Sequence, residues 1–172
     1  MNEENKTALE NDFVIRLAKI SDLEAILKIT KEAQLRIKRL DFDQWQNNYP
    51  NKEVFLQDIE LGQLYVYLEN ATVYAFFVLS KVKETNYQEL KWFSSNSTTI
   101  HRIAVADAKL KCHIASKIFA FCIAKSKLLG YDTIKVDTHK KNKAMLNLIN
   151  KYGFEYRGYL KSINREAFEK KL

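Results

Sequence analysis

The amino-acid sequence predicts an α+β fold, and three observations support this prediction. Short apolar runs at 64–68 and 72–82 have the composition and length of strands, with a turn signal between them. Apolar residues recur at helical spacing along 114–129. A third apolar run, 98–105, leads through a polar turn directly into that helix. Strands and helices in this succession favour a sheet flanked by helices.

The elements before this region follow from the same signals. Residues 13–18 alternate apolar and polar side chains, which predicts a half-buried strand. Ser21 and Glu24 have the spacing of a capping box and predict the start of a helix. The residues that this helix is expected to bury are Leu23, Ile26, Leu27, Ala33 and Ile37. A second, short helix is expected over about 51–61, where Gly62 ends it.

The remaining elements complete one domain. After the helix at 114–129 we expect strands at 133–137, 155–160 and 165–170 and a helix at 143–152. The chain has no internal repeat, low-complexity tract or interdomain linker. Its 172 residues suffice for a full hydrophobic core. We therefore expect a flexible acidic tail at 1–12 and a single domain over 13–172.

Composition bears on the cellular location of the protein and on whether it binds a metal. The chain is 47% hydrophobic and 28% charged, which is ordinary for a globular protein. No apolar run approaches the ~18 residues of a membrane span, and the first residues are polar and acidic, unlike a signal peptide. We expect a cytoplasmic protein that does not bind membranes. The two cysteines and three histidines lack the spacing of metal ligands, so no metal is expected.

The net charge of +7 is concentrated in one region, because residues 109–151 hold ten lysines and two aspartates. Many of these lysines surround the turn at 110–113, which opens the helix at 114–129. Such a turn directs backbone N–H groups and the helix dipole at an anion. We favour a polyanionic small cofactor as the ligand. A solvated lysine face is one alternative. Nucleic acid is a weaker one, because the cluster lacks arginines and interleaved aromatic residues.

Several segments, in this order, resemble the GCN5-related N-acetyltransferase (GNAT) superfamily, and most closely a poorly characterised bacterial branch of it. The segments are IRLAKISDLEAIL, QWQNNYP, IHRIAV, IASKIF, DTHKKNKAM and REAFEKKL. The resemblance implies a mixed, mostly antiparallel sheet of six or seven strands flanked by helices, with a V-shaped splay between the fourth and fifth strands. It also implies direct transfer of an acetyl group from acetyl-CoA to an amine of a small molecule, peptide or protein. A homodimer stays open.

The resemblance also assigns the cofactor contacts. The backbone of Ile103, Ala104 and Val105 would hold the pantetheine arm, and the Val105 amide would polarise the thioester carbonyl. The residues expected under the pyrophosphate are Leu110, Lys111, Cys112, His113, Ile114, Ala115 and Ser116. Asn142 would reach the pantetheine or the phosphates. The ammonium groups of Lys109, Lys111 and Lys117 would neutralise phosphate charge.

The phosphate turn departs from the superfamily pattern because it contains no glycine. His113 stands at the glycine position, and Lys111 or Cys112 stands where a further glycine is frequent. A non-glycine residue in the left-handed conformation costs ~1–2 kcal/mol, although histidine tolerates it better than most residues. We therefore expect a weakened cofactor site. A catalytically weak or inactive coenzyme A-binding protein is the alternative function, and a basic interaction module is a third.

The catalytic candidates follow from the same alignment. His101 lies four residues before Val105, where arylalkylamine acetyltransferases of this superfamily carry a histidine, and imidazole is a suitable base. A structural histidine is its alternative role. The tyrosine that often serves as general acid is replaced by Ile149, so Tyr152 is the nearest substitute. Residues expected to contact the acceptor, or else to pack in surface loops, are Trp45, Tyr49 and His139.

Overall fold

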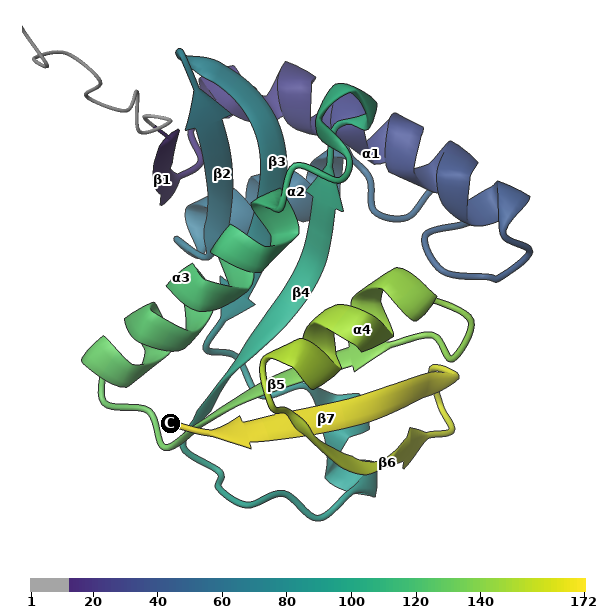
Figure 1. Cartoon of the computed structure of the whole chain (residues 1–172), viewed down its shortest axis with the longest axis vertical. Helices are drawn as coiled ribbons and strands as arrows, with labels where there is room; N and C mark the ends of the chain where they lie inside the picture. The colour runs from purple at the N-terminus through teal and green to yellow at the C-terminus, as the bar shows by residue number, and fades with distance from the viewer. Residues whose placement is uncertain (1–12) are drawn as a thin grey trace, which may run out of the picture.

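The computed structural model describes residues 13–172, so the tail expected at 1–12 lies outside the described residues. In the described part of the chain, seven strands form one sheet in the order β1-β2-β3-β4-β5-β7-β6 (Figure 1). The strands are β1 (Phe13–Leu17), β2 (Leu64–Glu69), β3 (Thr72–Ser80), β4 (Ser97–Val105), β5 (Thr133–Thr138), β6 (Glu155–Leu160) and β7 (Arg165–Lys171). Among these strands of residues 13–172, β4 and β5 form the single parallel pair. The mixed, mostly antiparallel sheet expected from the sequence is confirmed.

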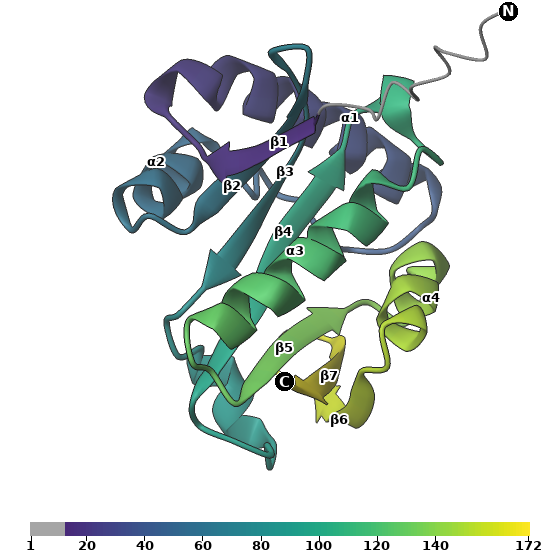
Figure 2. The ribbon, with the colours of Figure 1, turned by 60° about the vertical axis from the view of Figure 1, so that its left-hand side comes forward.

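The four α-helices of the described residues cover the two faces of this sheet (Figures 1 and 2). They are α1 (Leu23–Arg39), α2 (Lys52–Glu60), α3 (Ile114–Leu128) and α4 (Lys143–Lys151). The first two pack on one face, where Val66 and Phe76 join their core, and the last two pack on the other, where Tyr67 and Phe77 do. Successive residues of each strand therefore pack into two separate hydrophobic cores, one on each face of the sheet. None of the described helices combines the length and apolar character needed to cross a membrane.

The start of α1 differs from the sequence prediction. No Ser21–Glu24 capping box forms, because a 3₁₀ turn over Ile20–Asp22 precedes the helix. Asp22 instead accepts the hydrogen bonds that fix the start of the helix. Its carboxylate accepts a hydrogen bond from the backbone N–H of Lys19 (2.8 Å) and two from the Arg16 guanidinium (2.7 and 2.9 Å). Hydrogen bonding to Arg16 lowers the pKa of Asp22. This carboxylate thus ties β1 to the first turn of α1.

The expected splay lies between β4 and β5. The two strands pair only from Ser97 to Ile100, opposite residues 133–136, and diverge beyond that point (Figure 1). A bulge sits where the divergence begins, because Phe77 of β3 faces two residues of β4, Arg102 and Ile103. Arg102 has a left-handed φ of 47°. Such a bulge bends its strand and sharpens its twist.

The bulge is anchored by a buried ion pair. The guanidinium of Arg102 donates from Nε (2.9 Å) and Nη2 (2.7 Å) to the two carboxylate oxygens of Asp58 on α2. The Asp58 side chain is 4% exposed, so this charge depends on its partner. We infer that α2 fixes the backbone of β4 at the point where the sheet opens.

Candidate functional site

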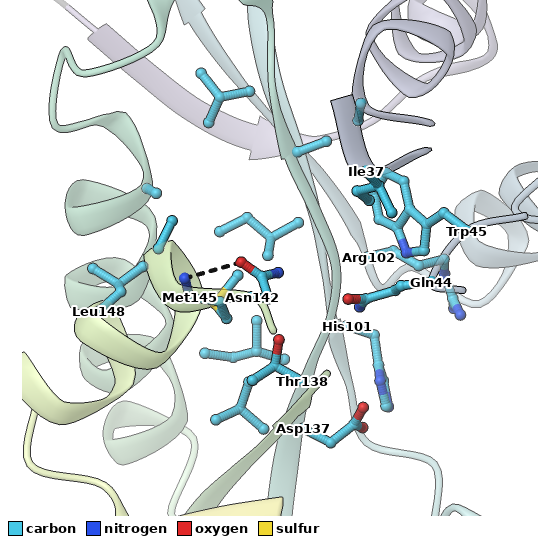
Figure 3. Close-up of a pocket in the computed structure, with 18 of the residues that line it drawn as sticks. Ile37, Gln44, Trp45, His101, Arg102, Asp137, Thr138, Asn142, Met145 and Leu148 are labelled. Carbon is cyan, nitrogen blue, oxygen red and sulfur yellow. Dashed lines mark hydrogen bonds between the residues drawn. The ribbon is translucent and has the colours of Figure 1, made fainter. Parts of the chain in front are cut away.

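A cavity of ≈ 1160 Å³ occupies the gap between the diverging strands. Its walls come from β4 and β5, from α1 and the loop that follows it, from the first turn of α3, and from α4 along its whole length (Figure 3). This volume slightly exceeds the ~300–1,000 Å³ typical of small-molecule pockets. One cleft therefore has room for an extended ligand together with a second, smaller one.

The end of β4 offers free backbone to this cavity. Ile103, Ala104 and Val105 line it. The N–H of Ala106 donates to the carbonyl of Tyr74 (2.8 Å), and in this antiparallel pattern the N–H and C=O of Val105 point away from β3. The carbonyl of Val105 accepts a hydrogen bond from Arg36 on α1 (2.9 Å). The N–H of Val105 is therefore the polar group left for a ligand in the gap.

The turn before α3 has two residues in the left-handed conformation, His113 at the expected glycine position and Lys111, one of the two candidates for the further glycine position. Lys111 has a φ of 64° and His113 a φ of 60°. His113 is the N-cap of α3, and its side chain makes no capping hydrogen bond. The first N–H groups of the helix thus keep their capacity to bind an anion. Of the seven residues expected here, all line the cavity except Cys112, which is exposed.

The lysines near this turn are not equivalent. The ammonium of Lys109 pairs with the Glu69 carboxylate (2.6 Å). That of Lys117, which does not line the cavity, lies 3.2 Å from the Tyr67 hydroxyl and over the Phe13 ring. Lys111 lines the cavity. So does Lys151 of α4, whose Nζ lies 3.0 Å from Oγ of Ser116 in the first turn of α3.

Lys151 was missed from the sequence. Its only local signal was its place in the last turn of α4. The side-by-side arrangement of that turn and the start of α3 is set by tertiary packing. The positive end of the cavity is therefore built by Lys111, Lys151 and the α3 N-terminus.

His101 lies at the opposite, acidic end of the cavity. Its Nε2 is 3.1 Å from a carboxylate oxygen of Glu84, but the contact is too poorly aligned for a hydrogen bond. Proximity to His101 lowers the pKa of Glu84. The Tyr87 hydroxyl donates to the Asp137 carboxylate (2.6 Å), and burial together with this negative charge raises the pKa of Tyr87. Figure 3 shows His101 and Asp137 at the same end of the cavity.

Besides Cys112, two predicted site residues, Tyr152 and His139, lie outside the cavity wall. The Tyr152 hydroxyl donates to the carbonyl of Ser116 (2.6 Å), while Ile149, at the usual tyrosine position, is fully buried. His139 is buried beside the ring of Phe42 (centroids 5.0 Å apart) and lines a neighbouring, more open pocket. Burial lowers the pKa of His139. The structure therefore does not bring either side chain to His101.

The other predicted residues do line the cavity. The Asn142 side chain caps α4 by accepting from the N–H of Met145 (3.2 Å), and Figure 3 shows its amide nitrogen on the cavity side. Trp45 is buried against Phe76, and the Tyr49 hydroxyl accepts from Arg102 (2.9 Å). Among residues 13–172, no group of three or more His, Cys, Asp and Glu side chains is arranged to hold a metal ion.

Comparison with known proteins agrees with this architecture. The sequence profile of the acetyltransferase (GNAT) family matches residues 31–154. The chain belongs to the GNAT family. No curated protein sequence matches the chain. A GNAT-family acetyltransferase from Streptococcus agalactiae is similar, with 26% identity, a TM-score of 0.83, and coverage of 93% of this chain and 95% of that one.

Two further GNAT structures share the fold. One, from Listeria monocytogenes, is 19% identical, with a TM-score of 0.78 over 93% of this chain and 95% of that one. The other is the PaiA N-acetyltransferase from Thermoplasma acidophilum in complex with coenzyme A. It is 17% identical, with a TM-score of 0.75 over 94% of this chain and 99% of that one. The overall fold is thus shared by chains of widely different sequence.

Proposed function

We propose that the protein is an acetyl-CoA-dependent N-acetyltransferase that moves an acetyl group directly to an amine of a small molecule, peptide or protein. The observation that carries this proposal is the continuous cavity in the β4–β5 splay. It is basic where α3 begins and acidic at His101. Membership of the GNAT family supports acetyl transfer in general.

The basic end of the cavity suits the pyrophosphate of the cofactor. The α3 N-terminus, Lys111 and Lys151 offer N–H donors and positive charge there. The free backbone edge at 103–105 suits the amides of the pantetheine arm. Bound acetyl-CoA supplies an activated acetyl thioester. In this arrangement the Val105 N–H polarises the thioester carbonyl, and Asn142 contacts the cofactor from the other wall.

The acidic end suits an amine. His101 accepts the proton that the attacking amine loses, and the neighbouring Glu84 carboxylate stabilises the imidazolium that results. Trp45 and Tyr49 contribute aromatic surface to the same part of the cavity. Cofactor and acceptor thus meet in one cleft, as direct transfer requires.

Calorimetric titration with acetyl-CoA, followed by turnover across an amine panel, tests the proposal. We expect His101→Gln to lower kcat about 10²–10⁴-fold, the usual contribution of a general base, with the acetyl-CoA Kd nearly unchanged. His139→Gln is the matched control, because this histidine lies outside the cavity wall, and it should leave kcat unchanged. Absence of acetyl-CoA binding by the wild-type protein would overturn the proposal.

A coenzyme A-binding protein with little or no catalysis is the second candidate. It is favoured by the buried Ile149 and by the engagement of the Tyr152 hydroxyl with Ser116. Micromolar acetyl-CoA binding without turnover of any amine would support it. Tyr152→Phe adds a further test: a general acid loses turnover with the hydroxyl, whereas a structural hydroxyl loses stability and leaves kcat unchanged.

A further inference from the structure

The turn before α3 is held mainly at its two ends. The residues of the turn, 110–113, are all exposed. Inside the turn, the N–H groups of Leu110 and Cys112 each reach a backbone carbonyl at 3.4 Å, which is longer than the about 2.7–3.2 Å of an ordinary N–H···O hydrogen bond. At one end Ile114, the first residue of α3, is 1% exposed in the hydrophobic core. The conformation of the turn therefore depends on what fixes its other end, Lys109.

That end is fixed by a carboxylate on a strand far from it in sequence. Glu69, the last residue of β2, accepts a hydrogen bond from the Lys109 ammonium (2.6 Å) and one from the Tyr67 hydroxyl (2.9 Å). These hydrogen bonds lower the pKa of Glu69, so the carboxylate stays charged. The Lys109 ammonium also lies over the ring of Tyr74 on β3, 4.9 Å from its centroid. Glu69, Tyr67 and Lys109 thus form one anchor for the turn, the Glu69 anchor.

The Glu69 anchor rests on well-packed parts of the sheet. Tyr67 is buried, and its ring stacks on that of Phe13 on β1 (centroids 5.1 Å apart). Glu69 leads directly into the tight turn between β2 and β3. Both residues of that turn, Asn70 and Ala71, have positive φ, as in the type I′ turns that join twisted strands closely. The carboxylate is therefore held in place from both sides and cannot readily follow a movement of the turn before α3.

The fixed ends maintain the unusual backbone of the turn. Lys111 and His113 are left-handed, with φ of 64° and 60°. Non-glycine residues stay in such a conformation where the surrounding structure over-determines it. Neither end of the turn can shift to relax them, because Ile114 is buried and Lys109 is paired with Glu69. The turn therefore has its shape before a ligand arrives, and binding does not have to order it.

We propose that Glu69 is a positioning residue for the anion-binding turn. Through Lys109 it keeps the backbone N–H groups before α3 aligned for a phosphate, and it thereby compensates for the absence of glycine from the turn. The inference rests on the proposed function for the identity of the ligand, acetyl-CoA. The order of the turn itself can be measured without any ligand.

Electrostatics and positioning predict opposite effects for Glu69. The carboxylate is a negative charge close to the basic end of the cavity, and it engages Lys109, which lines that cavity. If its effect were only electrostatic, its removal would free the ammonium and tighten the binding of acetyl-CoA. If it positions the turn, its removal loosens the turn and weakens binding. The sign of the change in affinity therefore separates the two roles.

Three substitutions test the positioning role. Glu69→Met removes both acceptor oxygens, and we expect it to weaken acetyl-CoA binding about three- to tenfold in calorimetry and to speed amide hydrogen exchange of residues 110–114 about tenfold in the ligand-free protein. Tyr67→Phe keeps the charge of Glu69 but removes one hydrogen bond, so both changes should be about two- to threefold. Glu89→Met is the matched control, because the Glu89 carboxylate accepts from the Lys161 N–H (2.9 Å) in a turn outside the cavity. It should speed exchange at 161–162 and leave exchange at 110–114 and acetyl-CoA affinity unchanged.

A double-mutant cycle with His113→Gly adds a test that a general loss of stability would not pass. Glycine adopts the left-handed conformation without steric cost, so the turn should then depend less on the Glu69 anchor. In the His113→Gly background, Glu69→Met should weaken acetyl-CoA binding by no more than about twofold. Tighter binding by Glu69→Met, unchanged exchange at 110–114 in both Glu69→Met and Tyr67→Phe, or an equal loss of affinity in both backgrounds would overturn the positioning role. If the wild-type protein fails to bind acetyl-CoA, the proposed function fails, while hydrogen exchange still decides the role of Glu69.

Discussion

Replacing His113 with glycine tests the physical reading of the phosphate turn. His113 holds a φ of 60° and is exposed, and its side chain makes no capping hydrogen bond. Glycine would relieve the ~1–2 kcal/mol cost of a left-handed residue. It would lose about 0.5–1 kcal/mol through the greater freedom of the unfolded chain. We expect His113→Gly to stabilise the protein by about 0.5–1 kcal/mol, which raises Tm by about 1–4 °C at this chain length.

Thermal and urea unfolding measure this change, and the neighbouring residue provides the control. Cys112 is also exposed, but its φ is not positive. Cys112→Gly should therefore destabilise the protein by about 0.5–1 kcal/mol, since glycine relieves no strain there. Acetyl-CoA should also bind His113→Gly more tightly, because phosphate approaches backbone without a Cβ more closely. If His113→Gly lowers Tm as Cys112→Gly does, the turn carries no strain and the reasoning is refuted.

Three further predictions concern charged groups. Asp58→Ala should cost about 3–5 kcal/mol in urea unfolding, because Arg102 loses its buried partner; a loss under about 1 kcal/mol would contradict this role. The Arg16 hydrogen bonds lower the pKa of Asp22, so its contribution is present above the ordinary carboxyl pKa of ~4 and is lost as pH falls through the lowered value. Wild type should exceed Asp22→Asn by about 1.5–3 kcal/mol near pH 7, and the two should converge in acid, as pH-dependent unfolding will show. Lys151→Met should weaken acetyl-CoA binding about two- to fivefold at low salt, whereas Lys117→Met, outside the cavity, should not.

The sequence predicted the elements well where the signal is local. Helical periodicity and the glycines at 62, 130 and 153 located the helices because each depends on residues within a few positions. The prediction of a Ser21–Glu24 capping box was wrong because Asp22 occupies the helix start instead, where it is held by Arg16 on β1. Residue spacing alone cannot decide whether Ser21 or Asp22 caps the start of the helix.

Long-range partners explain what the sequence missed at the site. The bulge at Arg102 depends on Asp58, 44 residues earlier. The family resemblance implied that Lys109 and Lys117 neutralise phosphate charge, but Glu69 and Tyr67 on β2 engage their ammonium groups. Lys151 reaches Ser116 only because α4 packs beside α3. The sequence therefore predicted which segments line the cavity. Which lysines already have a partner could be learned only from the three-dimensional structure.

The short pairing between β4 and β5 joins the two halves of the sheet at one end, so a small rotation there changes the width of the cleft at the other end. Ser97–Ile100 form the pivot, and the five residues from there to Val105 form an arm of about 17 Å, at ~3.3 Å per residue. A rotation of about 5° at the pivot moves the tip by roughly 1.5 Å, half the length of a hydrogen bond. Packing at Thr98 and Ser126, neither of which lines the cavity, therefore contributes to the width of the cleft. Adding or removing one methyl group there is therefore expected to shift the position of Val105 at the end of β4.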